Sequence, residues 1–211
     1  MINSPLSLEH LQYLREKYSS RQEGEEATEA FDDFIVNYTT SGANIDTTLK
    51  ALIRFIHRFF GFEYVAIALR NEKDGLYRYV YSIGLPAEAD SSYKKIAYSS
   101  SDLFDDATFP SVKICRFSRF YIAEKKPYKP GEESSYTRPN LLTLTRGHID
   151  DMIEGDYIDI YLHGSPSDVI GYFELAGTRS GKLPEKGTIK QIELIAVFIS
   201  RYLQNEHRGI R

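Results

Sequence analysis

Two segments near the C-terminal end alternate strictly between side chains suited to a core and side chains suited to a polar environment. Residues 157–163 and 168–176 both have this period of two, and only four residues separate them. This pattern is typical of half-buried β-strands, and the short connection predicts an antiparallel hairpin. We place residue 163 opposite 168 and residue 157 opposite 174, so that facing residues share one side of the sheet.

The predicted hairpin has two chemically different faces. One face is aliphatic and needs a cover of helices; its expected members are Ile158, Ile160, Leu162, Val169, Gly171, Phe173 and Leu175. The other face combines phenol rings with two carboxyl groups; its expected members are Tyr157, Asp159, Tyr161, Ile170, Tyr172 and Glu174. A tyrosine is apolar at its ring and polar at its hydroxyl, which suits a half-buried pocket. Tyrosines also favour a solvated sheet face, so both interpretations stay open.

A second hairpin is predicted earlier in the chain. Phe62 to Arg70 and Leu76 to Gly84 flank a polar loop that ends in Gly75. In the first of these strands Val65, Ile67 and Leu69 alternate with Tyr64, Ala66 and Ala68. The side chains expected to join the tyrosine face are Tyr64, Tyr77, Tyr79 and Tyr81.

Helical spacing of apolar residues precedes the strands. Residues 1–43 are expected to form a helical extension, with a first helix capped by Ser4-Pro5 or by Ser7 and a second helix ending near Gly42. From Ile45 to Phe60 the apolar residues again follow a helical period, after Asn44 or Asp46 as a cap and before Gly61 as the terminating glycine. We therefore divide the chain into an extension, residues 1–43, and a main domain, residues 44–207.

The last helix is apolar around most of its circumference. Its predicted start is the capping box from Thr188 to Gln191, and it is expected to reach His207. One arc carries Ile189, Ile192, Ile195, Ala196, Ile199 and Leu203, and Leu194, Val197, Phe198 and Tyr202 extend beyond it. Such a helix is fully buried or shared with a partner. We expect one stripe to cover the sheet and the other to contact a second subunit; the alternative is that the N-terminal helices cover it.

Residues 85–155 have little periodicity. Residues 112–123 resemble a strand, and short helices are expected at 102–107 and 141–151. Long irregular segments in compact domains are typically lids or binding loops, so we expect this segment to cover the tyrosine face. Within it, Tyr136 and Arg138 are candidate ligand contacts, because a guanidinium suits an anionic or carbonyl-bearing ligand. The alternative is an exposed loop arginine.

Composition and motifs exclude several classes of function. The net charge of −4 argues against a nucleic-acid partner. No apolar run approaches the ~20 residues that span a bilayer, and residues 1–6 have no signal-peptide pattern. We therefore expect a cytoplasmic protein without a membrane partner.

The nucleophile and metal-ligand content of the sequence also limits the chemistry. Cys115 is the single cysteine, which excludes an intrachain disulfide, and it is expected to be buried and inert. The five histidines have no metal-binding spacing, and no catalytic-serine or phosphate-loop motif occurs. We assign no catalytic residue, metal site or named cofactor.

The order of these elements, together with several short segments, resembles the GAF domain family across residues 44–205. The segments that carry the resemblance are Leu49 to Leu69, Ser118 to Ile122, Asp159 to Gly164, Val169 to Leu175 and Ser180 to Pro184. The resemblance implies an α+β fold with a central antiparallel sheet, the N- and C-terminal helices on one face and a lid and pocket on the other. It also implies small-molecule sensing and signal relay, often as a dimer through those helices.

We expect a non-enzymatic sensor that binds a small molecule between the sheet and residues 85–155. It would form a homodimer through its terminal helices and signal to a separate output protein. The candidate ligand-binding residues are Tyr64, Tyr79, Tyr121, Tyr136, Arg138, Tyr157, Asp159, Tyr161, Tyr172 and Glu174. One alternative is a structural dimerisation module without a ligand. The other is an enzyme that uses Asp159 and Glu174, since two adjacent carboxyls can serve as acid and base.

Overall fold

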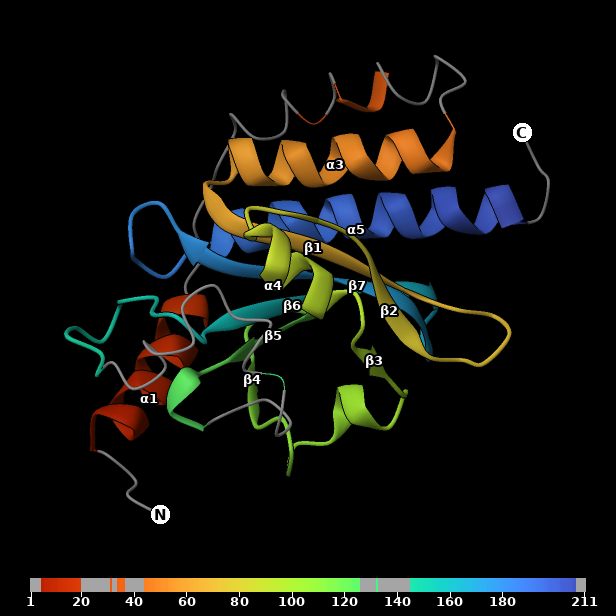
Figure 1. Ribbon diagram of the computed structural model, residues 1–211. Coiled ribbons are helices and arrows are strands. Elements are labelled where there is room, and N and C mark those ends of the chain that lie inside the picture. The colour runs from red at the N-terminus through yellow and green to blue at the C-terminus, as the bar shows by residue number, and fades with distance from the viewer. Residues whose placement is uncertain are drawn as a thin grey trace.

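The computed structural model describes residues 5–19, 31, 34–36, 44–125, 132 and 145–207. Its centre is a seven-stranded antiparallel sheet with the order β3-β2-β1-β7-β6-β5-β4 (Figure 1). The strands are β1 (Phe62–Arg70), β2 (Tyr77–Ile83), β3 (Ala97–Tyr98), β4 (Ser111–Lys113), β5 (Ser118–Tyr121), β6 (Tyr157–Ser165) and β7 (Asp168–Thr178). Both predicted hairpins are confirmed, and they meet at the β1–β7 pairing in the middle of the sheet. The fold is α+β, as expected.

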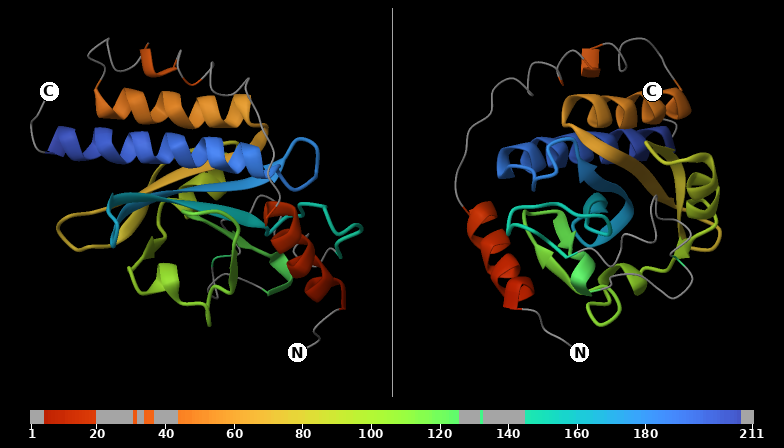
Figure 2. Two further views of the ribbon diagram at one scale, coloured as in Figure 1. Left: turned by 180° about the vertical axis from the view of Figure 1, so that it is seen from behind. Right: turned by 60° about the vertical axis from the view of Figure 1, so that its left-hand side comes forward.

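Helices α3 (Ile45–Phe59) and α5 (Lys186–His207) lie side by side on one face of the sheet (Figures 1 and 2). Asn44 caps α3, because its side chain accepts a hydrogen bond of 2.9 Å from the backbone N–H of Thr47. Gly61 follows α3 with φ of 73°, the left-handed conformation predicted for a terminating glycine. The predicted start of α5 at Thr188 is wrong: the helix begins at Lys186, so Thr188 lies within its first turn.

Helix α1 (Pro5–Ser19) flanks the sheet on the side of β4 and β5 (Figure 2). Its Leu14 is fully buried in the main core. The helix predicted to end near Gly42 falls largely outside the described residues. Of its range, the structure describes residues 31 and 34–36, and these are helical. No helix in the described ranges is long and apolar enough to cross a membrane.

The predicted aliphatic face forms the main core beneath the helices. Ile158, Ile160, Phe173 and Leu175 are fully buried there. The helices contribute Leu49, Leu52, Ile53 and Ile56 from α3 and Ile189, Ile192, Ile195 and Ile199 from α5. Each such side chain stabilises the fold by about 1.5–3 kcal/mol when it is removed from water. Because the helices cover the aliphatic face, the tyrosine face is the one that lies on the opposite side of the sheet, away from α3 and α5.

The second apolar stripe of α5 is partly covered by the chain itself. The ring of Phe31 lies 5.8 Å from that of Phe198 on α5 and 6.5 Å from that of Phe55 on α3. The alternative that the N-terminal residues of the same chain cover this stripe of α5 therefore applies to Phe198. Leu194 and Val197 remain 63% and 44% exposed.

The predicted register of the β6–β7 hairpin is wrong by two residues. Tyr157 pairs with Ala176 and Asp159 with Glu174, and irregularities near the turn absorb the difference. Because side chains alternate with a period of two, a shift of two residues leaves the faces unchanged. Near the turn a bulge at Ile170 breaks the alternation, so Ile170 packs on the helix side and Val169 joins the tyrosine side, the reverse of the prediction.

A second bulge corrects the assignment of Tyr81. The register of β1 and β2 shifts between the pairs Ile67–Tyr81 and Ala68–Tyr79. Tyr77 and Tyr79 stay on the tyrosine side, whereas Tyr81 packs against the helix-side core. The ammonium of Lys50 on α3 lies 4.9 Å from the Tyr81 ring centroid.

The segment 85–155 has more structure than its sequence indicates. Helix α4 (Ala87–Tyr93) and strand β3 are not predicted, and the strand expected over 112–123 is the antiparallel pair β4–β5. The helix expected at 102–107 is only the 3₁₀ turn η1 (Asp102–Phe104). The helix expected over 141–151 is wrong for residues 145–151, which are irregular and end in a β-bridge between Asp151 and Lys182; residues 141–144 lie outside the described ranges.

Candidate functional site

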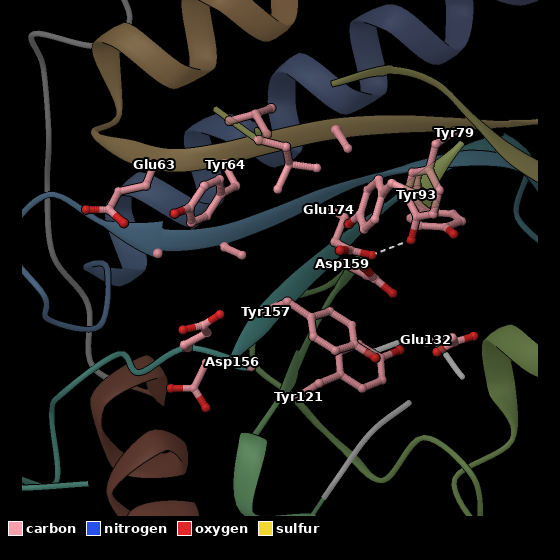
Figure 3. A pocket seen from close by; sticks show the side chains of 18 of the residues that line it. Glu63, Tyr64, Tyr79, Tyr93, Tyr121, Glu132, Asp156, Tyr157, Asp159 and Glu174 are labelled. Atoms are coloured by element: carbon pink, nitrogen blue, oxygen red, sulfur yellow. Dashed lines mark hydrogen bonds between the residues drawn. The ribbon is translucent and has the colours of Figure 1, made fainter. Parts of the chain in front are cut away.

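A cavity of about 360 Å³ lies between the tyrosine face of the sheet and residues of the segment 85–155 (Figure 3). This volume falls within the range of roughly 300–1,000 Å³ typical of small-molecule sites. Seven of the predicted site residues line it: Tyr64, Tyr79, Tyr121, Tyr157, Asp159, Tyr172 and Glu174. Tyr161 lies beside the cavity, where its hydroxyl hydrogen-bonds that of Tyr121 at 2.9 Å and the carbonyl of Leu103 at 3.2 Å. Tyr136 and Arg138 lie outside the described residues.

Two carboxyl groups stand next to each other on the sheet wall. Asp159 on β6 and Glu174 on β7 are directly opposite in the register, whereas the predicted register places Asp159 opposite Tyr172. Glu174 accepts a hydrogen bond of 2.5 Å from the Tyr79 hydroxyl (Figure 3). Asp159 is only 4% exposed, and its Oδ1 has no hydrogen-bond partner within the described part of the chain.

Burial governs the ionisation of this pair. Desolvation raises the pKa of Glu174 to about 7, although the hydrogen bond from Tyr79 opposes the rise. Desolvation also raises the pKa of Asp159 well above its ordinary value, against the opposing effects of Tyr121 and Arg119. Burial therefore favours the protonated form of both carboxyls, and a positively charged ligand beside them would favour the ionised form.

Aromatic rings form the wall beside Glu174. The Tyr93 ring stacks on Tyr79 with centroids 4.0 Å apart, and Tyr172 and Tyr98 approach Tyr79 edge-on at 5.9 and 6.4 Å. Desolvation raises the pKa of Tyr79 and Tyr172 well above the ordinary value, so these phenols keep their protons. Neutral phenols can donate a hydrogen bond and offer a π-face.

A second aromatic group closes the wall on the other side of the carboxyl pair. Tyr121 of β5 stacks on Tyr157 of β6 with centroids 4.4 Å apart and an interplanar angle of 10° (Figure 3). Burial raises the pKa of Tyr121 well above its ordinary value. The carboxyl pair therefore lies between two groups of rings.

Sequence reasoning missed the contributions of the covering segment. Tyr93, at the end of α4, and Tyr98, in β3, line the cavity, as does Glu132. The Tyr98 hydroxyl donates a hydrogen bond of 3.0 Å to the Glu132 carboxylate. The sequence of α4 has no helical periodicity that could have placed Tyr93; the abundance of tyrosine was the only available signal.

The lining is acidic within the described part of the chain. Its carboxyl residues are Glu63, Asp102, Glu132, Glu154, Asp156, Asp159 and Glu174, and no described lining residue is a lysine, arginine or histidine. Asp102 accepts hydrogen bonds from the backbone N–H and hydroxyl of Ser99, at 2.7 and 2.8 Å. The described wall thus has no cationic group of the kind expected from Arg138.

A buried ion-pair network, which was not predicted, holds one edge of the cavity. Arg146 is 2% exposed and donates hydrogen bonds of 2.8–3.0 Å to the carboxylates of Asp156 and Glu124. Asp156 also accepts backbone N–H bonds from Ala123 at 2.9 Å and Ile153 at 2.8 Å. Arg146 therefore ties the loop over residues 152–156 to the turn η2 (Ala123–Lys125).

Helix α1 meets this network through His10. The His10 ring, which is fully buried, contacts the carbonyl oxygen of Ile149. Desolvation lowers the pKa of His10 to about 4, and the charge of Arg146 adds to the effect. The ring is therefore neutral near pH 7, which fits a packing role.

The remaining candidate groups lie away from the cavity. Cys115 is half-buried in the β4–β5 turn, and desolvation raises the pKa of its thiol to about 11, which disfavours the reactive thiolate. In the described ranges, no group of three or more histidine, cysteine, aspartate or glutamate side chains is arranged to hold a metal ion.

Comparisons with known proteins identify the fold. No protein-family model matches the sequence, and no curated protein matches it. Solved structures do match, including the GAF domain/HD domain protein of Geobacter sulfurreducens, with a TM-score of 0.56 and 13% identity over 79% of this chain and 97% of that one. The GAF domain of a phosphoenolpyruvate-protein phosphotransferase from Acinetobacter matches with a TM-score of 0.55 and 11% identity, over 89% and 98% of the two chains.

A bacteriophytochrome from the photosynthetic bacterium R. palustris also matches, with a TM-score of 0.53 and 13% identity. The match covers 88% of this chain and 38% of that one. At these identities the similarity establishes the fold alone. The chain has a GAF-type fold, as its sequence resemblance implies.

Proposed function

We propose that this chain is a non-enzymatic sensor module that binds a small molecule in the 360 Å³ cavity and relays its occupancy to another protein. The observation that carries the proposal is the buried carboxyl pair on the cavity wall, with an Asp159 oxygen that has no hydrogen-bond partner in the described part of the chain. A buried polar group without a partner costs free energy. A ligand that bonds to it would recover part of that cost. A fold shared with the domain of a putative two-component sensor histidine kinase supports the same function.

The sheet offers a short route from the cavity to the helices. Asp159 and Glu174 project into the cavity, while their neighbours Ile158, Ile160 and Phe173 pack into the core beneath α3 and α5. A ligand that binds one arrangement of this wall more tightly shifts the population of the arrangements, and the helices respond through the shared strands.

The output surface in this proposal is the second stripe of α5. Its exposed Leu194 and Val197 would form a homodimer contact in the cytoplasm, and a separate output protein would read the dimer's helices. Exposed apolar side chains that gather on one helix face are typical of such contacts.

A metabolite panel with a thermal-shift measurement tests ligand binding. A ligand present at 100 times its Kd stabilises the folded state by about 2.7 kcal/mol. Ala176→Leu, which places a larger side chain on the cavity wall, should abolish the shift, whereas Ala107→Leu at an exposed position outside the cavity should preserve it. Absence of any shift across a broad panel, with no small molecule retained in native mass spectrometry, would contradict the proposal.

The alternative of a structural dimerisation module is favoured by one observation, the exposure of Leu194 and Val197. It predicts a dimer whose stability no small molecule changes. The enzymatic alternative requires turnover that Asp159→Asn and Glu174→Gln abolish, and turnover that survives both substitutions would remove it.

A further inference from the structure

The charge of the cavity wall is compensated unevenly. Arg146 pairs with Asp156 at 2.8 Å, so that carboxylate has its own counter-ion. Arg119, the register partner of Asp159, forms an ion pair of 2.6 Å with Asp106 and donates a hydrogen bond of 2.9 Å to the Ser111 hydroxyl. Within the described residues, Asp159 and Glu174 therefore have hydroxyl neighbours but no ion pair.

The groups around this pair suit a cation. Tyr79 donates a hydrogen bond to Glu174, and the rings of Tyr93, Tyr98 and Tyr172 pack on Tyr79. The faces of such rings attract ammonium and guanidinium groups, and most strongly where water is excluded. Carboxylates and π-faces together repel an anion, so the described wall favours a cation.

From this combination we infer that the cavity binds a small organic cation, with its positive group at Asp159 and Glu174 and its apolar body between the two groups of tyrosines. The inference rests on the proposed ligand-binding function and specifies the ligand's chemical class. A cation would supply the partner that the Asp159 Oδ1 lacks. It would also replace the water that burial removes from the two carboxyls.

Three probes of similar shape and different charge test the inference. Phenethylammonium carries the cation, 2-phenylethanol is neutral and 3-phenylpropionate is an anion. Calorimetry on the full chain at pH 8 should give a Kd for phenethylammonium at least ~10-fold lower than for the other two probes, as expected for a desolvated cation–π and carboxylate site.

Variants locate the binding. Asp159→Asn and Glu174→Gln should each weaken phenethylammonium binding at least ~10-fold, because each keeps the shape of the side chain and removes a carboxyl group that the bound cation would stabilise in its charged form. Glu88→Gln, an exposed carboxyl on α4 that does not line the cavity, is the matched control and should leave the Kd unchanged. Circular dichroism and thermal unfolding establish that each variant is folded.

The outcomes separate this inference from the proposed function. If 2-phenylethanol or 3-phenylpropionate bound more strongly than phenethylammonium, and Ala176→Leu blocked that binding, the inference of a cationic ligand would be overturned. The proposed ligand-binding function would still stand. Phenethylammonium binding that Asp159→Asn and Glu174→Gln do not weaken would overturn the site. Failure of all three probes together with an unresponsive metabolite panel would overturn both.

Discussion

Glu174 shows how a single side chain couples this cavity to the stability of the fold. Its carboxyl is held on β7 between Tyr79, which donates to it, and Asp159, which stands opposite. Desolvation raises its pKa to about 7 from an ordinary value of 4.5. Between these pH values the folded protein holds a proton that the unfolded chain releases, so the free energy of unfolding falls as the pH rises through this window.

Glu174→Gln should remove this pH dependence. One pKa unit corresponds to about 1.4 kcal/mol, so the rise from 4.5 to about 7 means that ionised Glu174 lowers the free energy of unfolding above pH 7 by on the order of 3–4 kcal/mol. We expect the variant to match the natural protein at pH 4.5 and to exceed its stability at pH 8, measured by urea unfolding. The exposed Glu88→Gln should show no such difference. A stability change of equal size at both pH values would contradict the assignment.

Gly171 matters because backbone approaches it closely. A methyl group added there would lie 2.5 Å from the carbonyl oxygen of Ala68 on β1 and 2.8 Å from Leu69 Cδ2. Gly171→Ala should therefore destabilise the fold by about 1–3 kcal/mol, the typical cost of overpacking. Gly147→Ala, whose nearest neighbour is the side-chain Oδ2 of Asp151 at 3.3 Å, should stay within about 0.5 kcal/mol. Chemical denaturation measures both, and equal effects would contradict the argument.

At the scale of elements, strands that alternate were predictable and bulges were not. The faces of β6 and β7 followed from a period of two, which is a property of every strand. Val169, Ile170 and Tyr81 were misplaced because a bulge inserts one residue into a ladder and reverses the sides beyond it. Nothing in the local residue types marks where that residue is inserted.

The covering segment was less predictable because tertiary contacts determine its structure. Helix α4 has seven residues, and β3 has two, too few for a periodic pattern to be distinguished from chance. Seven of the ten candidate site residues line the cavity because they belong to long strands or pair with them. Tyr93, Tyr98 and Glu132 were missed because their positions depend on how the segment returns to the sheet.

The Arg146 network should be essential for the loop that it holds. Arg146→Met keeps the aliphatic length and leaves the buried carboxylate of Asp156 and the partly exposed carboxylate of Glu124 without their cation. Removing one partner of a buried ion pair typically costs about 3–5 kcal/mol. The exposed pair Arg78–Asp74 provides the control, since Arg78→Met should cost no more than about 1 kcal/mol. Thermal and urea unfolding compare the two; similar losses would contradict a special role for Arg146.

In the whole molecule, the two faces of the sheet have different neighbours. Helices α3 and α5 cover the aliphatic face, and the tyrosine face borders the cavity (Figures 1 and 3). The same strands form both surfaces, so a change at Asp159 lies one side chain from Ile158 and Ile160 beneath the helices. The proposed relay therefore needs no separate connecting element between the cavity and α5.

The proposed homodimer would pass a response of α5 from one chain to a second copy. Leu194 and Val197, one turn apart on α5, are exposed while their helical neighbours Ile192, Ile195 and Ile199 are buried. Glutamate at both positions would place two charges in the proposed apolar contact, and unpaired charges are costly to remove from water. We expect light scattering with size-exclusion chromatography to give a dimer for the natural chain and a monomer for Leu194→Glu/Val197→Glu.

The control for this experiment is Val80→Glu, which changes an exposed valine on β2 in the other hairpin. It introduces the same kind of charge on a surface that α5 does not share, so the dimer should persist. A natural chain that is monomeric at tens of micromolar, or a dimer that survives the α5 substitutions and dissociates with Val80→Glu, would place the contact elsewhere. Because the substituted side chains point away from the core, unchanged circular dichroism would assign the loss of the dimer to the surface of α5.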